Sequence, residues 1–263
     1  MMLVIGEKIN GMYKAVGKAI QEKNKETIQK LAKDQVAAGA DYLDVNTGPS
    51  SANPVEAMEW LVDTIQEVTD TPLCLDTTKP EVMEAGLRKC KEKAMINSTP
   101  GQQEKLDVFL PLAAKYNASI IGLAMDEKGI PRDAAGRAEI ALRIVAAAME
   151  KGINPEDLYI DPLILPVNVA QTTAGQVLES LRQFKLLSDP PPKTVLGLSN
   201  VSQGTKYREL INRTYLVMAQ ACALDAAIID PLDNELMDAM ITAELLLNKN
   251  IYCDAFLKAY RKK

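Results

Sequence analysis

Residues 72–80 read PLCLDTTKP and contain the parts of one repeating unit of the fold. The apolar run Pro72–Leu75 is continuous rather than alternating, which is typical of a strand buried on both faces of a parallel sheet. Asp76 follows directly, and Lys79-Pro80 places a proline where a helix begins. The stretch therefore predicts a buried strand, a polar residue at its end and a helix after it.

The same unit recurs along the whole chain. Besides Pro72–Leu75, we expect strands at Leu3–Ile9, Tyr42–Val45, Ala94–Ile96, Ser119–Met125, Leu158–Ile160, Thr194–Leu198 and Ala226–Ile229. Helical patterns lie between them at Lys25–Ala38, from Asn53-Pro54, around Val82–Lys91, and at Gln102–Tyr116, Ala135–Lys151, Thr173–Leu187, Lys206–Ala223 and Asn234–Asn248. A terminal helix is expected over Tyr252–Lys263.

Eight such units in 263 residues, with no linker or shift in composition, predict a single domain over residues 1–263. The fold class is α/β, and the architecture is one (β/α)₈ TIM barrel, which typically needs about 250 residues. A doubly wound open sheet is the alternative architecture.

Composition narrows the function classes. The formal net charge of −5 and a pI near 5.1 give no electrostatic footprint for nucleic acid. We find no apolar run long enough to span a bilayer, and the opening MMLVIGEKIN is too soon charged for a secretory signal, so a cytoplasmic location is expected. The four cysteines are scattered without metal-ligand spacing, which favours buried reduced thiols and no metal site.

The chain contains no histidine. This excludes Ser-His and Cys-His catalysis and every histidine-ligated metal site. Any acid–base step must therefore use carboxylates, Lys, Tyr, Cys, water or the substrate itself.

Polar residues stand at the end of nearly every predicted strand. In (β/α)₈ barrels the carboxyl ends of the strands form the active-site face, so these side chains are candidates for one site. A buried carboxylate or amide is costly without a partner, which suggests a ligand rich in hydrogen-bond donors. The alternative is that each residue only caps the next helix. The set comprises Glu7, Asn10, Asp44, Asn46, Asp76, Asn97, Asp126, Asp161, Ser199, Asn200, Asp230 and Asp233.

Residues 197–204, GLSNVSQG, leave the seventh strand without the glycine pattern of a nucleotide loop. Barrels often bind phosphate at this place, so a phosphate cradle remains open from the spacing alone. The hydroxyl and amide side chains favour a polar heterocycle at least as well. Arg208 could meet a carboxylate or phosphate at the mouth of the pocket.

Six short motifs, taken in order, resemble the pterin-binding barrel superfamily: GEKIN at 6–10, LDVNTG at 43–48, LDTTKP at 75–80, INSTPG at 96–101, IDPL at 160–163 and GLSNVSQG at 197–204. That superfamily includes dihydropteroate synthases and methyltetrahydrofolate-dependent methyltransferases. Dihydropteroate synthases typically carry a lysine at the end of strand seven, where this chain has Ser199-Asn200. The overall likeness is greatest to the methyltetrahydrofolate:corrinoid/iron–sulfur protein methyltransferases of the acetyl-CoA pathway.

The resemblance implies an enzyme that moves the N5 methyl group of 5-methyltetrahydrofolate to Co(I) of a corrinoid. Asn200 would be the catalytic residue, donating a hydrogen bond to N5 while water relays the proton. The chain would hold no tightly bound cofactor and no metal. The implied methyltetrahydrofolate-binding residues are Asp76, Asn97, Asp161, Gly197, Ser199, Asn200, Gln203 and Arg208.

Without histidine the usual DxHxxG cobalamin motif is impossible here, so the cobalamin or related corrinoid must belong to a partner protein or arrive free. The resemblance implies a corrinoid/iron–sulfur protein as that partner and a homodimer as the oligomeric state. The alternatives are a dihydropteroate synthase-like enzyme, another corrinoid-dependent methyltransferase, and a folate-binding module without chemistry of its own.

Overall fold

The structure is a computed structural model that describes residues 1–49, 51 and 53–261. Eight parallel strands pair in chain order, and β8 pairs back to β1, so the sheet closes into a barrel. The predicted TIM barrel is thereby confirmed, and the open sheet is excluded. The strands are β1 (Leu3–Asn10), β2 (Tyr42–Asn46), β3 (Leu73–Asp76), β4 (Met95–Pro100), β5 (Ser119–Leu123), β6 (Leu158–Asp161), β7 (Lys193–Gly197) and β8 (Ala226–Ile229).

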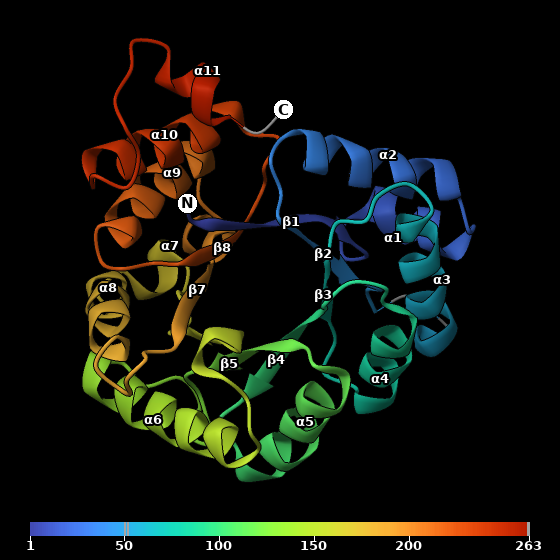
Figure 1. The fold of residues 1–263 in the computed structure, drawn as a ribbon, viewed down its shortest axis with the longest axis horizontal. Coiled ribbons are helices and arrows are strands. Elements are labelled where there is room, and N and C mark those ends of the chain that lie inside the picture. The colour runs from blue at the N-terminus through green and yellow to red at the C-terminus, as the bar shows by residue number, and fades with distance from the viewer. Residues whose placement is uncertain (50, 52, 262–263) are drawn as a thin grey trace.

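The helices form a ring around the barrel (Figure 1). They are α1 (Lys14–Gln21), α2 (Lys25–Ala37), α3 (Pro54–Gln66), α4 (Pro80–Lys89), α5 (Gln103–Tyr116), α6 (Ala134–Glu150), α7 (Val167–Ala170), α8 (Thr173–Phe184), α9 (Arg208–Gln220), α10 (Asn234–Leu246) and α11 (Phe256–Tyr260). Short 3₁₀ turns lie at Pro155–Asp157 (η1) and Leu198–Ser202 (η2). In the described part of the chain, no helix has the length and hydropathy needed to cross a membrane.

Many expected boundaries shift by one to three residues in the structure. β4 continues to Pro100, so Asn97 lies inside the strand rather than after it, and β5 ends two residues early at Leu123. Leu198 opens η2 instead of closing β7. The terminal helix covers only Phe256–Tyr260, and the last two residues of the expected helix lie outside the described part. The expected series also lacked α1 and α7, each of eight residues or fewer.

Apolar side chains fill the barrel interior at the N-terminal end of the strands. One core cluster joins Ile5, Cys74, Met95, Ile121, Tyr159, Val195 and Ala226, which come from seven of the eight strands. A larger cluster occupies the layer between strands and helices. Because the interior is packed below, the polar residues at the C-terminal ends of the strands face a cavity that is closed at its floor.

Two glycines let the loops after β1 and β2 cross in contact. Gly48 has a φ of 70°, a conformation that favours glycine. A Cβ on Gly48 would lie 2.5 Å from the carbonyl carbon of Gly11, and a Cβ on Gly11 would lie 2.4 Å from the carbonyl oxygen of Thr47. The Gly48 N–H donates to Asn46 Oδ1 at 2.6 Å, so this crossing also fixes the side chain of Asn46.

Gly48→Ala should therefore destabilise the protein by more than the cost of a positive φ alone. Gly152→Ala is the matched control, because Gly152 has a φ of 76° and nothing within 4 Å of an added Cβ. We expect the control to cost about 1 kcal/mol and Gly48→Ala about 2–4 kcal/mol, measured by urea unfolding. Equal losses in the two variants would show that the crossing tolerates a methyl group.

Candidate functional site

A cavity of about 510 Å³ opens at the C-terminal ends of the strands. All eight residues implied as methyltetrahydrofolate-binding line it, although they come from β3, β4, β6, β7, η2 and α9. Two carboxylates and one amide from the expected ring join them: Glu7, Asp44 and Asn10. The structure thus brings the predicted site residues together around one space.

Two aspartates of this site are held by neutral amides. Asn97 donates to Asp44 Oδ1 at 3.0 Å, and Asn46 donates to Asp76 Oδ2 at 2.7 Å. Burial raises the pKa of Asp44 well above its usual value, and the nearby Asp76 carboxylate adds to the rise. Burial also raises the pKa of Asp76, against the lowering effect of the Asn46 hydrogen bond. The pair therefore has strong proton affinity and carboxylate oxygens left to accept hydrogen bonds.

Asp161, at the end of β6, is held by backbone N–H groups. Leu163 donates to its Oδ1 at 2.7 Å and Gly197 to its Oδ2 at 3.3 Å. The loop after β6 turns back for the first bond, with Leu163 at a φ of 64°. Asp161 is 6% exposed, and burial raises its pKa to about 6, opposed by those two bonds and by the Arg137 guanidinium.

Glu7 closes the β7–β8 side of the cavity. The Ser199 hydroxyl donates to Glu7 Oε1 at 2.7 Å, and Arg208 Nη2 donates to the Ser199 carbonyl oxygen at 3.2 Å. Burial raises the pKa of Glu7, the Ser199 bond lowers it, and the Asp230 charge raises it. Arg208 also donates through Nε to Ser202 Oγ at 3.1 Å, so its guanidinium braces η2 at the cavity rim.

Asn200 and Gln203 leave their amide groups free. Asn200 lies on η2 and Gln203 directly after it; both are exposed and line the cavity. Neither side chain has a hydrogen-bond partner among the described residues. An unpaired amide at the rim is available to a ligand without the cost of breaking an existing bond.

Four members of the expected ring do not line this cavity. Asn46 lies behind the lining and donates to Asp76, as described above. Asp126 accepts from Arg143 at 2.9 Å and from the Lys128 N–H at 3.0 Å. Asp230 pairs with Lys8 at 2.8 Å. Asp233 caps α10 through the N–H groups of the residues that follow it. For Asp233 the helix-cap interpretation was correct, and for Asp126 and Asp230 an ion pair replaces a ligand role.

Sequence reasoning missed part of the lining. The cavity also contacts Met12, Tyr13, Ser98, Leu123, Leu163 and Ile228. Leu123 and Ile228 are the last inward-facing apolar residues of β5 and β8, so strand alternation would have found them. Met12 and Tyr13 follow β1 in a short loop, and no pattern in the sequence marks their contact with the cavity.

The phosphate cradle gains little support from residues 197–204. The Ser202 hydroxyl is used inside the turn, since it donates to the Ser199 carbonyl oxygen at 3.3 Å and accepts from Arg208.

In the described residues, no cluster of His, Cys, Asp and Glu could hold a metal ion. The cysteines are unpaired; Cys74 and Cys222 are buried as expected, but Cys253 is exposed.

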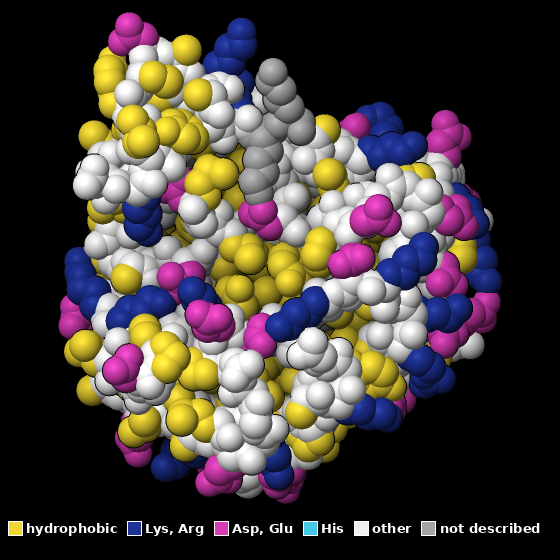
Figure 2. All heavy atoms as spheres, in the orientation of Figure 1, with side chains coloured by type: hydrophobic (Ala, Val, Ile, Leu, Met, Phe, Trp, Pro, Cys, Tyr) yellow, Lys and Arg dark blue, Asp and Glu magenta, His cyan; other side chains and the backbone are white. Residues whose placement is uncertain are grey.

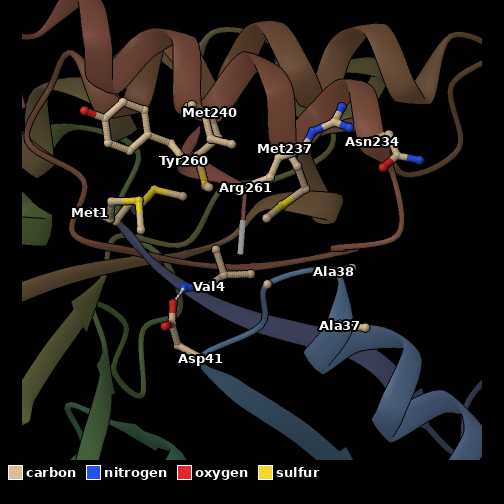
Figure 3. A pocket seen from close by; sticks show the side chains of 13 residues that line it. Met1, Val4, Ala37, Ala38, Asp41, Asn234, Met237, Met240, Tyr260 and Arg261 are labelled. Carbon is tan, nitrogen blue, oxygen red and sulfur yellow. Dashed lines mark hydrogen bonds between the residues drawn. The ribbon is translucent and has the colours of Figure 1, made fainter. Parts of the chain in front are cut away.

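A second cavity, of about 240 Å³, lies between α10 and the end of α2, beside the start of the chain (Figure 3). Its lining is mainly apolar, with Met1, Val4, Met237 and Met240 pointing into it. Figure 2 shows further hydrophobic side chains on the same side of the molecule, over α10 and α11. Asp41 is its one lining carboxylate, and it accepts from the Val4 N–H at 2.9 Å. Its polar lining residues are Asp41, Asn234 and Arg261, far fewer than at the C-terminal mouth, so the mouth is the candidate active site.

The raised pKa of Asp161 predicts a specific pH dependence of stability. An aspartate in the unfolded chain has a pKa of about 3.9. Between that pH and about 6 the folded state binds more protons than the unfolded state, so Asp161 makes stability fall as pH rises. Relative to wild type, Asp161→Asn should gain about 2–3 kcal/mol of unfolding free energy as pH rises from about 4 to 7.

Urea unfolding at a series of pH values measures this difference. Asp126→Asn is a control of opposite sign, because the Arg143 hydrogen bond lowers the pKa of Asp126. That aspartate contributes stability which is lost as pH falls, so its replacement should flatten the acid limb instead. A constant difference between Asp161→Asn and wild type at every pH would contradict the electrostatic account.

Comparison with known proteins identifies relatives of this chain. The pterin binding enzyme family matches residues 14–230. A methylcorrinoid:tetrahydrofolate methyltransferase of Eubacterium limosum is 32% identical over 266 residues, covering 99% of this chain and 97% of that protein. The methionine synthase of Mycobacterium tuberculosis is 29% identical over 241 residues; the match covers 87% of this chain and 20% of that much longer protein.

Solved structures give the same fold at low identity. A dihydropteroate synthase from Coxiella burnetii, in complex with pteroic acid, has a TM-score of 0.69 at 16% identity, over 93% of this chain and 94% of that chain. The Yersinia pestis dihydropteroate synthase with a pterine–sulfa conjugate has the same TM-score at 17% identity, over 95% and 94%. Together with the family match over most of the barrel, these findings show that the chain belongs to the pterin binding enzymes.

Proposed function

We propose that this protein transfers a methyl group between N5 of tetrahydrofolate and the cobalt of a corrinoid carried by a partner protein. The proposal rests on the buried carboxylates and free amides that surround one open cavity. The carboxylates accept hydrogen bonds from uncharged donors, as Asp44 and Asp76 do from Asn97 and Asn46. The near full-length similarity to a methylcorrinoid:tetrahydrofolate methyltransferase supports this reaction.

The pterin ring presents adjacent N–H donors and a carbonyl along one edge. In our proposal Asp76 and Asp161 accept from those donors, which are strong charge-assisted hydrogen bonds when the acceptor is ionised. Asn97 uses its amide N–H on Asp44, which leaves its carbonyl oxygen for the ring. Gly197, Ser199, Gln203 and Arg208 line the remaining walls.

Asn200 is the proposed catalytic residue. When the methyl group leaves N5 for Co(I), the electron pair of the C–N bond stays on N5, which must gain a proton. The reverse transfer uses the N5 electron pair to take the methyl group, and N5 loses its proton. An amide is not a proton donor at neutral pH, so Asn200 acts by a hydrogen bond that strengthens as charge develops, with water carrying the proton.

The direction of methyl transfer and the identity of the corrinoid protein are the most specific parts of the proposal. The sequence resemblance implies transfer from methyltetrahydrofolate to a corrinoid/iron–sulfur protein in the acetyl-CoA pathway, whereas the Eubacterium limosum relative is named for the opposite direction. The same side chains serve both, because the forward and reverse reactions share one transition state. We keep the iron–sulfur protein as the proposed partner and the homodimer as the proposed assembly.

One optical assay tests the function. The purified protein is mixed with 5-methyltetrahydrofolate and free cob(I)alamin, and formation of methylcobalamin is followed; tetrahydrofolate with methylcobalamin tests the reverse. Catalysis in either direction is the expected result. Condensation of a dihydropterin pyrophosphate with p-aminobenzoate instead would show a dihydropteroate synthase, and folate binding without either reaction would show a non-catalytic module.

Asn200→Ala should lower kcat more than it raises KM for 5-methyltetrahydrofolate. Losing one preorganised donor to a developing charge costs about 10²–10³ in kcat. Gln203→Ala is the comparison, because it removes an equally exposed amide next to the same turn; its effect should fall mainly on KM. Single-turnover kinetics with cob(I)alamin separates the two cases, and wild-type kcat in Asn200→Ala would remove that residue from the mechanism.

An apolar arc on one half of the mouth is suited to receive the partner. It consists of Met12, Tyr13, Val169, Tyr207, Leu210 and Leu232, which follow β1, β6, β7 and β8 and are 37–80% exposed. In the described parts of the loops after β2 to β5, no large hydrophobic side chain is exposed to that degree. Exposed apolar groups beside a polar cavity are typical of a protein-binding surface.

Tyr207→Glu or Leu210→Glu should slow methyl transfer with a protein-bound corrinoid by about tenfold or more, since a charge is then buried at the contact. Transfer with free cobalamin should change little. Leu186→Glu is the control, because Leu186 is 84% exposed and follows α8 at the opposite end of the barrel. Equal losses with free and protein-bound corrinoid would place the partner elsewhere.

A further inference from the structure

Arg137 is a buried arginine without an ion-pair partner. It lies in the first turn of α6, and the residue is 0% exposed. Its Nη1 donates to the Arg132 carbonyl oxygen at 3.2 Å, while Nε and Nη2 have no hydrogen-bond partner. A buried guanidinium left partly unpaired is expensive, so its retention calls for a role beyond packing.

Asp161, a buried carboxylate of the proposed pterin site, is one of the negative charges that interact with Arg137. α6 packs against β6, and β6 ends in Asp161, a carboxylate with only backbone N–H partners. Each of the two side chains is buried, and neither takes part in an ion pair among the described residues. The Arg137 charge is the one cationic influence that lowers the pKa of Asp161, and Asp161 acts in the reverse sense on Arg137.

The other groups that interact electrostatically with Arg137 carry no positive charge. Tyr215 faces Arg137 from α9 and donates its hydroxyl to the Ala174 carbonyl oxygen at 2.7 Å. Asp133, on the solvent side, caps α6 through the Gly136 N–H. Inside the cavity stand the carboxylates Glu7, Asp44 and Asp76, and the Arg208 guanidinium is bonded within η2.

We propose that Arg137 is a positioning residue of the pterin site: its buried positive charge keeps Asp161 negatively charged, and therefore able to accept hydrogen bonds from the pterin. The acceptor role of Asp161 rests on the proposed function. Arg137 itself touches no ligand, because it lies outside the cavity lining. Its unpaired nitrogens are consistent with a charge placed for its field rather than for a direct bond.

Two variants separate charge from hydrogen bonding. Arg137→Gln removes the charge and keeps an N–H donor; Arg137→Lys keeps the charge. Arg143→Gln is the control, because it removes a positive charge from the same helix at the Asp126 ion pair, outside the cavity. Arg137→Met, which preserves the apolar stem, replaces the Gln variant if that protein does not fold.

The direct readout is the titration of the Asp161 carboxyl carbon by ¹³C NMR in ligand-free protein, assigned with Asp161→Asn. In Arg137→Gln it should move about one pH unit higher, as expected for loss of a nearby opposite charge. Arg137→Lys should restore the wild-type titration at least in part, and Arg143→Gln should leave it unchanged. An unmoved titration in Arg137→Gln, or in Arg137→Met where that variant replaces it, overturns the proposal.

Calorimetry with 5-methyltetrahydrofolate between about pH 5.5 and 8.5 gives the functional readout. Affinity depends on ionised Asp161, so it falls as pH drops through the Asp161 pKa, and in Arg137→Gln this fall should begin about one pH unit higher. The variant should bind about fivefold more weakly near pH 6 and equal wild type above about pH 8. Equal weakening at every pH overturns the proposal, since that result means a structural role.

The two proposals can fail separately. If neither wild type nor any variant binds the ligand, although the NMR titration moves, the proposed function fails and the Arg137–Asp161 coupling stands.

Discussion

The mouth of this barrel is organised by the cost of burying carboxylates that form no ion pair among the described residues. Asp44, Asp76 and Asp161 are held by amide and backbone N–H groups, and Glu7 by a hydroxyl. Neutral donors offset only part of the lost hydration, and for this reason burial leaves all four pKa values raised. The packed apolar floor prevents water from reaching the site from below. A ligand with several N–H donors is the partner that such a set of acceptors lacks.

The surrounding loops are shaped to bring those neutral donors into place. The crossing at Gly11 and Gly48 fixes Asn46, and Asn46 in turn holds Asp76. The left-handed conformation of Leu163 turns its N–H toward Asp161. These are local backbone features, each tied to one carboxylate, so the site depends on the exact course of the loops more than on the helices behind them.

The fold was predictable because its eight strand centres are continuous apolar runs. The strand-end rule then found five of the eight implied binding residues, Asp76, Asn97, Asp161, Ser199 and Asn200, and the family resemblance added Gly197, Gln203 and Arg208; all eight line one cavity. The rule failed for Asp126 and Asp230, whose cationic partners Arg143 and Lys8 lie 17 and 222 residues away in sequence. The search for helical patterns in the sequence missed α1, because Gly17 interrupts an otherwise helical pattern there. Arg137 could not be recognised at all, because a charge near a helix start reads as part of a solvated face. Dimerisation and the identity of the corrinoid protein stay predictions.

The one-sided placement of the apolar arc divides the mouth into two sectors. Asp44, Asp76 and Asn97, on β2 to β4, lie on the sector without exposed hydrophobic residues, while Asn200 lies on the sector with the arc. In the proposed reaction both sectors contact the heterocycle, since Asp161 and Ser199 lie in the sector with the arc, but only this second sector offers a hydrophobic surface to an incoming macromolecule. Substitutions at arc residues outside the cavity lining, such as Tyr207 and Leu210, can then alter which carrier is accepted without touching the heterocycle contacts. Such a barrel can acquire new carriers during evolution while its small-molecule specificity stays constant.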